Sequence, residues 1–165
     1  MTDPRGLRLG MGVYVYINHT GDSVTRWSRT GFVVFLNEAP IYNISKEKLH
    51  EKQVPLEVSL LQLSKLLNMS EDFVYKIRMF GIPCEDPTFV YGNNQHFLAN
   101  ISVPVSTLNK KYNSSAFHFL QEGCASDERR NTYVNTHENP ADLLTHPLPL
   151  GEKMWRFIMR FLYWS

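Results

Sequence analysis

Two polar segments of the chain carry residue types with which a protein could hold a metal ion. The first is Asn93-Asn94, which follows the short apolar stretch 88–91, and the second is Asp142 in Asn139-Pro140-Ala141-Asp142. Mg²⁺ prefers hard, charged oxygen ligands, so Asp142 is a candidate ligand, whereas the amide of Asn93 offers only a neutral oxygen. Each also has an ordinary explanation, because Asn93-Asn94 could form a turn and Asp142 could cap a helical turn.

A β-sheet is the element that would position the first of these segments. β-Branched and aromatic residues predict strands at residues 11–18, 31–36, 41–45, 88–91 and 131–135. Short turns join the first three, so we expect them to form an antiparallel meander.

Helical spacing of apolar residues predicts the elements that surround this sheet. They are residues 55–80 (one kinked helix or two shorter ones), 114–124, a helical turn at 141–144, and a terminal helix at 151–164. Gly81-Ile82-Pro83 would end the first of them. The order βββαβαβα predicts an α/β fold with a mixed sheet, three antiparallel strands followed by helix-linked strands, in a single domain 1–165.

Composition sets limits on the cellular setting and on the partners. The 165 residues carry a formal net charge of +1, so no global field favours nucleic acid. Two cysteines suit a reducing compartment. The N-terminal residues lack the apolar core of a signal peptide, and no apolar run approaches the roughly 20 residues of a membrane span. We therefore expect an intracellular protein, cytoplasmic or nuclear, with no membrane partner.

Several short motifs follow one another along the chain in an order that is typical of one protein family. They are Gly21-Asp22, Thr25-Arg26-Trp27-Ser28-Arg29-Thr30-Gly31-Phe32, Ala39-Pro40-Ile41-Tyr42 with Ser45-Lys46, Arg78-Met79-Phe80-Gly81-Ile82-Pro83, Ser106-Thr107-Leu108-Asn109-Lys110-Lys111, Ala116-Phe117-His118-Phe119-Leu120-Gln121-Glu122 and Asn139-Pro140-Ala141-Asp142. In this order and spacing they resemble the ribonuclease H domain of copia-type retrotransposon polyproteins, which follows the reverse transcriptase. The resemblance covers about residues 11–150 and implies a ribonuclease H-like fold, with residues 151–165 as the terminal helix.

The resemblance also implies a chemistry and the residues that should perform it. The family cuts the RNA strand of RNA–DNA hybrids with two Mg²⁺ ions about 4 Å apart, held by several carboxylates. Its first-strand aspartate falls at Tyr16, its fourth-strand aspartate at Asn93, and its last acid at Asp142, while Asn18 replaces a further acid. The helix glutamate has no clear counterpart, Glu57 and Glu71 being the nearest acids. Asp142 is thus a vestigial metal ligand, so we expect hydrolysis to be lost or very slow, and no cofactor although active relatives use Mg²⁺.

Two alternatives to a degenerate nuclease domain stay open. An active endoribonuclease could have relocated its acidic ligands, for instance to Asp22, Asp86 or Asp127, which requires further carboxylates beside Asp142. A non-catalytic module could instead bind nucleic acid or protein. RNA–DNA hybrid or duplex phosphates would then meet basic residues that the fold brings to one side: Arg26, Arg29, Lys46, Lys110, Lys111, Arg129 and Arg130.

The aromatic end of the chain is the candidate for a protein-binding surface. It comprises Trp155, Phe157, Phe161, Tyr163 and Trp164. The competing interpretation is that these side chains pack the last helix onto the sheet.

Overall fold

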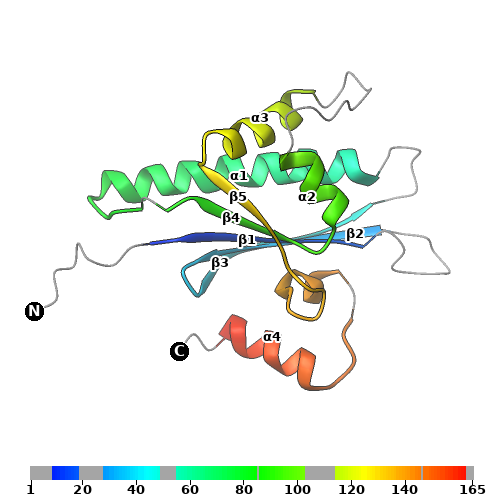
Figure 1. Cartoon of the computed structure of the whole chain (residues 1–165). Coiled ribbons are helices and arrows are strands. Elements are labelled where there is room, and N and C mark those ends of the chain that lie inside the picture. The colour runs from blue at the N-terminus through cyan, green and yellow to red at the C-terminus, as the bar shows by residue number, and fades with distance from the viewer. Residues whose placement is uncertain are drawn as a thin grey trace, which may run out of the picture.

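A five-stranded mixed sheet forms the centre of the molecule (Figure 1). The computed structural model describes residues 9–18, 28–48, 55–84, 86–102, 114–145 and 147–162. The strands are β1 (Met11–Asn18), β2 (Ser28–Leu36), β3 (Ala39–Lys48), β4 (Thr88–Gly92) and β5 (Arg129–Tyr133). Their order in the sheet is β3-β2-β1-β4-β5. The first three are an antiparallel meander, and β4 and β5 run parallel to β1.

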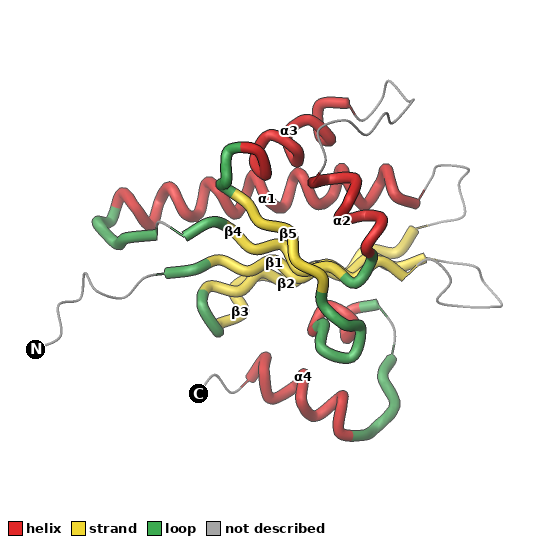
Figure 2. Tube along the Cα trace, in the orientation of Figure 1, coloured by secondary structure: helices red, strands yellow, loops and turns green. Residues whose placement is uncertain are grey.

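Helices α1 (Pro55–Met79), α2 (Gln95–Ser102) and α3 (Ser114–Ala125) lie on one face of the sheet (Figures 1 and 2). Side chains alternate along a strand, so Val13, Val15 and Ile17 of β1 all point to this face. They form the main core with leucines of α1 such as Leu60 and Leu63. This layer supports the sheet from the side opposite η2 and α4 (Figure 1).

The opposite face of the sheet carries the 3-10 helix η2 (Pro140–Leu144) and the terminal helix α4 (Glu152–Leu162), as Figure 1 shows. A smaller core joins Tyr14, Val33, Phe35 and Ala141 there. A Cβ atom added to Gly31 would lie 2.5 Å from the carbonyl oxygen of Ala141. Glycine at this point of β2 therefore lets η2 approach the sheet closely.

The predicted fold class is confirmed, together with the meander, the fourth strand, η2 and the terminal helix. The segment 55–80 is one helix rather than two. Gly81 takes a φ of 77° and Ile82 N donates to Ile77 O, which ends α1 as the sequence indicates.

The predicted order βββαβαβα was wrong at one point, because two helices separate β4 from β5. The missed helix, α2, is short and begins directly after the predicted Asn93-Asn94 turn, where Asn94 Oδ1 accepts a hydrogen bond from Phe97 N at 3.0 Å. The last strand begins two residues earlier than predicted, at Arg129. The sequence did not indicate this start, because a charged arginine is more typical of a loop than of a strand. None of the described helices is both long enough and apolar enough to cross a membrane.

Candidate functional site

The parallel pairing of β1 and β4 brings two of the predicted site positions side by side. Tyr14 lies opposite Tyr91 in the register of these strands. Tyr16 and Asn93 each lie two residues further on, so they project from the same face at the carboxyl ends of neighbouring strands. Sequence reasoning alone had placed them only by resemblance.

Asn139 holds η2 against this corner of the sheet. Its side chain is fully buried, Nδ2 donates to Val15 O at 2.9 Å, and Oδ1 accepts from Ala141 N at 3.0 Å. One amide thus joins the central strand to the first turn of η2, in which Pro140 needs no donor partner. As a result, Asp142 lies against β1, and its side chain has no exposed surface.

The three predicted positions converge through Thr136. Asn93 Nδ2 donates to Thr136 Oγ1 at 3.4 Å. The Tyr16 phenol donates a hydrogen bond to the Asp142 carboxylate and also hydrogen-bonds Thr136. Burial, followed by the charge of Asp142 and the hydrogen bond to it, raises the pKa of Tyr16 to about 12. Tyr16 therefore faces Asp142 as a neutral hydrogen-bond donor.

A cation that sequence reasoning missed completes this group. Lys153 Nζ of α4 lies 2.5 Å from Asp142 Oδ2, and the side chain of Lys153 is 28% exposed. Its ammonium also lies 5.8 Å from the centre of the Phe157 ring. Nothing in the local sequence marks Lys153, because an amphipathic terminal helix normally carries lysines on its solvent face. Only the packing of α4 beside η2 brings it to Asp142.

The other acids that the sequence offered lie elsewhere. Glu71 Oε1 accepts from Arg129 Nε at 2.8 Å, and burial raises the pKa of Glu71 against the opposing effect of Arg129. Asp86 and Asp127 lie just before β4 and β5, at the ends of these strands remote from Asn93. Asp22 falls outside the described residues, as does the side chain of Glu57. Across the described part of the chain, no group of three or more His, Cys, Asp and Glu side chains could hold a metal.

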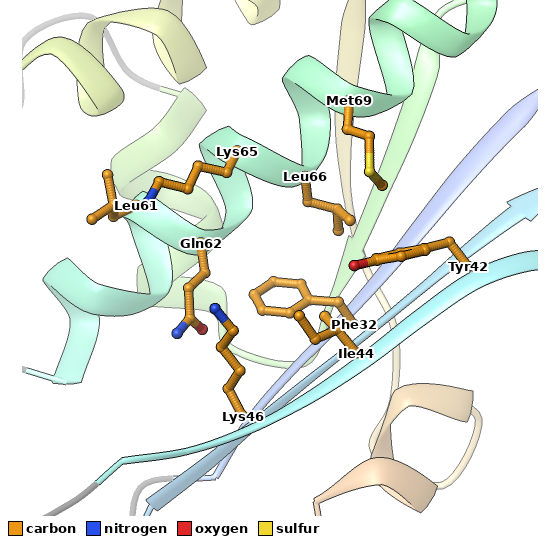
Figure 3. A pocket seen from close by; sticks show the side chains of 9 residues that line it. All are labelled: Phe32, Tyr42, Ile44, Lys46, Leu61, Gln62, Lys65, Leu66 and Met69. Carbon is orange, nitrogen blue, oxygen red and sulfur yellow. The ribbon is translucent and has the colours of Figure 1, made fainter.

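Of the predicted basic residues that the structure describes, Arg29 and Lys46 lie on different faces of the sheet. Thr30 pairs with Lys46 and Arg29 with Glu47, so strand alternation places Arg29 and Lys46 on opposite faces of the sheet. Lys46 lines a cavity of about 320 Å³ between β3 and α1, across from Gln62 and Lys65 (Figure 3). Arg29 is exposed on the face of Tyr16.

The remaining basic residues have structural partners or cannot be placed. Arg129 is 3% exposed, donates to Glu71 and to Phe119 O, and stacks on the Phe119 ring. Arg130 is exposed and forms a bidentate pair with Asp127. Arg26, Lys110 and Lys111 lie outside the described residues.

The aromatic end of the chain packs onto the sheet in its described part. Phe157 is 1% exposed, and the Phe161 ring lies 6.0 Å from that of Phe35 on β2. Trp155 points to solvent at 59% exposure. Tyr163 and Trp164 fall outside the described residues.

No family model matches the chain, but two curated proteins of Arabidopsis thaliana are similar to most of it. The retrovirus-related Pol polyprotein from transposon RE2 is 26% identical over 147 residues, or 87% of this chain. The polyprotein from transposon RE1 is 24% identical over 144 residues, again 87% of the chain. The chain spans 10% of the length of each relative. The predicted resemblance to a retrotransposon polyprotein is thereby confirmed.

Solved structures with a similar course of the chain share little sequence with it. Ribonuclease H1 from the halophilic archaeon Halobacterium salinarum NRC-1 aligns with a TM-score of 0.48 and 12% identity, over 84% of this chain and 95% of the other. The protease-reverse transcriptase of prototype foamy virus aligns with a TM-score of 0.43 and 11% identity, over 97% of this chain and 20% of the other.

Proposed function

We propose that this chain, a ribonuclease H-like domain related to retrotransposon Pol polyproteins, keeps the fold of that lineage but does not hydrolyse RNA. The observation that carries the proposal is the ion pair between Lys153 and Asp142 at the point where Tyr16 and Asn93 converge. The charge that a metal ion would supply is already provided by a side chain of the protein.

The residues of this corner do not fit a pair of Mg²⁺ ions. Two dications close together need several carboxylates, because neutral oxygens cannot offset their mutual repulsion. Asp142 contributes one negative charge, which Lys153 neutralises, and the Tyr16 phenol keeps its proton. Asn93 adds an amide. A first Mg²⁺ would have to displace the ammonium, and a second would find no anionic ligand among these four residues.

The polyprotein setting suggests partners for such a domain. By the lineage, a reverse transcriptase segment would precede it, and the nucleic acid presented to it would be an RNA–DNA hybrid or duplex. In this proposal the domain takes no metal cofactor. Any contribution that the domain makes in this proposal comes from binding.

A cleavage assay tests the proposal directly. An end-labelled RNA–DNA hybrid is incubated with the full chain in millimolar Mg²⁺, and separately in Mn²⁺, beside the Asp142→Asn variant. We expect no RNA cleavage above the level of Asp142→Asn with either metal. Metal-dependent cleavage by the unaltered chain that disappears in Asp142→Asn would overturn the proposal and favour an active nuclease with relocated ligands.

A further inference from the structure

The second face of the sheet carries a row of aromatic rings that α4 covers only in part. The rings of Tyr14 and Tyr91 stack with their centres 4.6 Å apart, and Phe89 continues the row at 6.1 Å from Tyr91. The ring and guanidinium contacts of α4 go to Tyr14 and Phe35, which belong to β1 and β2. Tyr91 and Phe89 on β4 are therefore left half-buried rather than enclosed.

A crevice of about 370 Å³ opens between this row and α4. Its wall on the sheet side includes Tyr14, Tyr91 and Thr132, and its wall on the helix side includes Arg156, Phe157 and Arg160. Tyr14 lies two residues before Tyr16, and Tyr91 lies two residues before Asn93. The crevice therefore adjoins the group formed by Tyr16, Asn93, Asp142 and Lys153, here called the Asp142 corner, on the same face of the sheet.

Two arginines of α4, Arg156 and Arg160, line the crevice. Arg160 Nη2 donates to Tyr14 Oη at 2.6 Å, and the guanidinium carbon lies 4.8 Å from the centre of the Tyr14 ring. This contact uses one of the donors of Arg160 and fixes the orientation of the others. Arg156 pairs with the exposed Glu152 at 3.1 Å, and an exposed pair of this kind competes only weakly with another anion.

We propose that this aromatic and arginine-lined crevice binds a single-stranded nucleic acid segment, with a base against Tyr91 and the adjacent phosphates on Arg156 and Arg160. Aromatic faces accept any base by stacking, and guanidinium groups neutralise the backbone. The site differs from the Asp142 corner in its residues and needs no metal. It stands independently of whether the domain hydrolyses RNA, because its readout is binding alone.

One acidic residue in the crevice should weaken phosphate binding, so replacing it should increase the affinity for nucleic acid. Glu138 also lines the crevice, and its exposed carboxylate repels a nearby phosphate. Replacing it by glutamine removes the repulsion and leaves a side chain of the same size. A gain of affinity in Glu138→Gln cannot arise from loss of folding, whereas a loss of affinity in other variants could.

The test titrates the full chain into a fluorescently labelled oligothymidylate and follows the fluorescence anisotropy. In a second experiment, adenosine monophosphate is added as a competitor. We expect the oligonucleotide to bind. The logarithm of its association constant should fall with the logarithm of salt concentration at a slope of about −1.4, because each of two phosphate contacts contributes about −0.7. Arg156→Gln should make the slope shallower by about 0.7. Tyr91→Leu should weaken binding roughly tenfold, and Glu138→Gln should strengthen it.

Lys65→Gln is the matched control, since Lys65 is exposed on α1, on the other face of the sheet. Competition by adenosine monophosphate that Tyr91→Leu abolishes would assign the crevice to nucleotides generally, and its absence would assign it to a strand. The proposal is overturned if the oligonucleotide does not bind at low salt, or if Lys65→Gln lowers the affinity as much as Arg156→Gln.

Discussion

Lys153 Nζ lies 2.5 Å from Asp142 Oδ2, and the two residues come from different helices on the same face of the sheet. Asp142 is completely buried, while 28% of the Lys153 side chain is exposed and its ammonium lies 5.8 Å from the centre of the Phe157 ring. A buried carboxylate is costly unless it is paired. This contact therefore couples the charge of the Asp142 corner to the docking of the terminal helix.

Lys153→Met should destabilise the domain strongly. The substitution keeps most of the apolar stem but leaves Asp142 buried without its cation, which typically costs about 3 kcal/mol or more in the free energy of unfolding. Urea denaturation at neutral pH measures the loss. Arg156→Met in the same helix breaks the exposed pair with Glu152 and should cost at most about 0.5 kcal/mol. The double variant Asp142→Asn with Lys153→Met should recover part of the stability, and no recovery would contradict the pairing argument.

Restoring negative charge should restore a response to Mg²⁺. Asn93→Asp combined with Lys153→Met places a second carboxylate at this corner and removes the competing ammonium. At a Mg²⁺ concentration ten times its dissociation constant, binding would stabilise the folded state by about 1.4 kcal/mol. Thermal unfolding with Mg²⁺ against Na⁺ of equal ionic strength measures this gain. The unaltered chain should show none, and an equal gain there would mean that Asp142 is available to metal in spite of Lys153.

Tyr16 should ionise at a higher pH than an ordinary tyrosine. Its pKa of about 12 exceeds the ordinary value of 10.0, so between these pH values the unfolded chain releases the proton while the folded chain retains it. The stabilisation from this group is complete below pH 10 and is lost as the pH rises towards 12. Ultraviolet absorption of tyrosinate should show a late phase that Tyr16→Phe removes. Tyr75→Phe, at an exposed position on α1, should leave that phase unchanged.

The five strands and most of the helices could be predicted because strand alternation and helical spacing are local properties of sequence. The β1–β3 meander and α1 followed from them directly. Helix α2 could not be predicted, because it has only eight residues and follows an asparagine pair that also suits a turn. The start of β5 was hidden by Arg129, since a buried arginine in a strand depends on Glu71 some 58 residues earlier in the chain.

The candidate site could be predicted only where family resemblance supplied positions. Tyr16, Asn93 and Asp142 converge, but Thr136 and Lys153, which connect and neutralise them, carry no local signal. Their roles arise from the packing of separate segments. Net charge was equally uninformative, because Arg29 and Lys46, only 17 residues apart, lie on opposite faces of the sheet.

Asn139 should contribute to stability well beyond what a loop asparagine contributes. Asn139→Ala removes the bonds to Val15 O and Ala141 N and leaves both buried backbone groups without this partner. Each such loss costs about 1–3 kcal/mol, so we expect the free energy of unfolding to fall by roughly 2–6 kcal/mol.

Asn135→Ala is the matched control for this prediction, because Asn135 Oδ1 accepts from His137 N at 3.0 Å in an exposed turn. Its cost should stay near 0.5 kcal/mol, within the range of surface substitutions. If Asn139 holds η2 to β1, its removal should also withdraw Asp142 from Tyr16 and lower the pKa of Tyr16 from about 12 towards 10.0. If Asn139→Ala lowers the stability but leaves the pKa of Tyr16 unchanged, Asn139 supports the fold without positioning Asp142. A simultaneous change in both would identify one buried amide as the link between the central strand and the site.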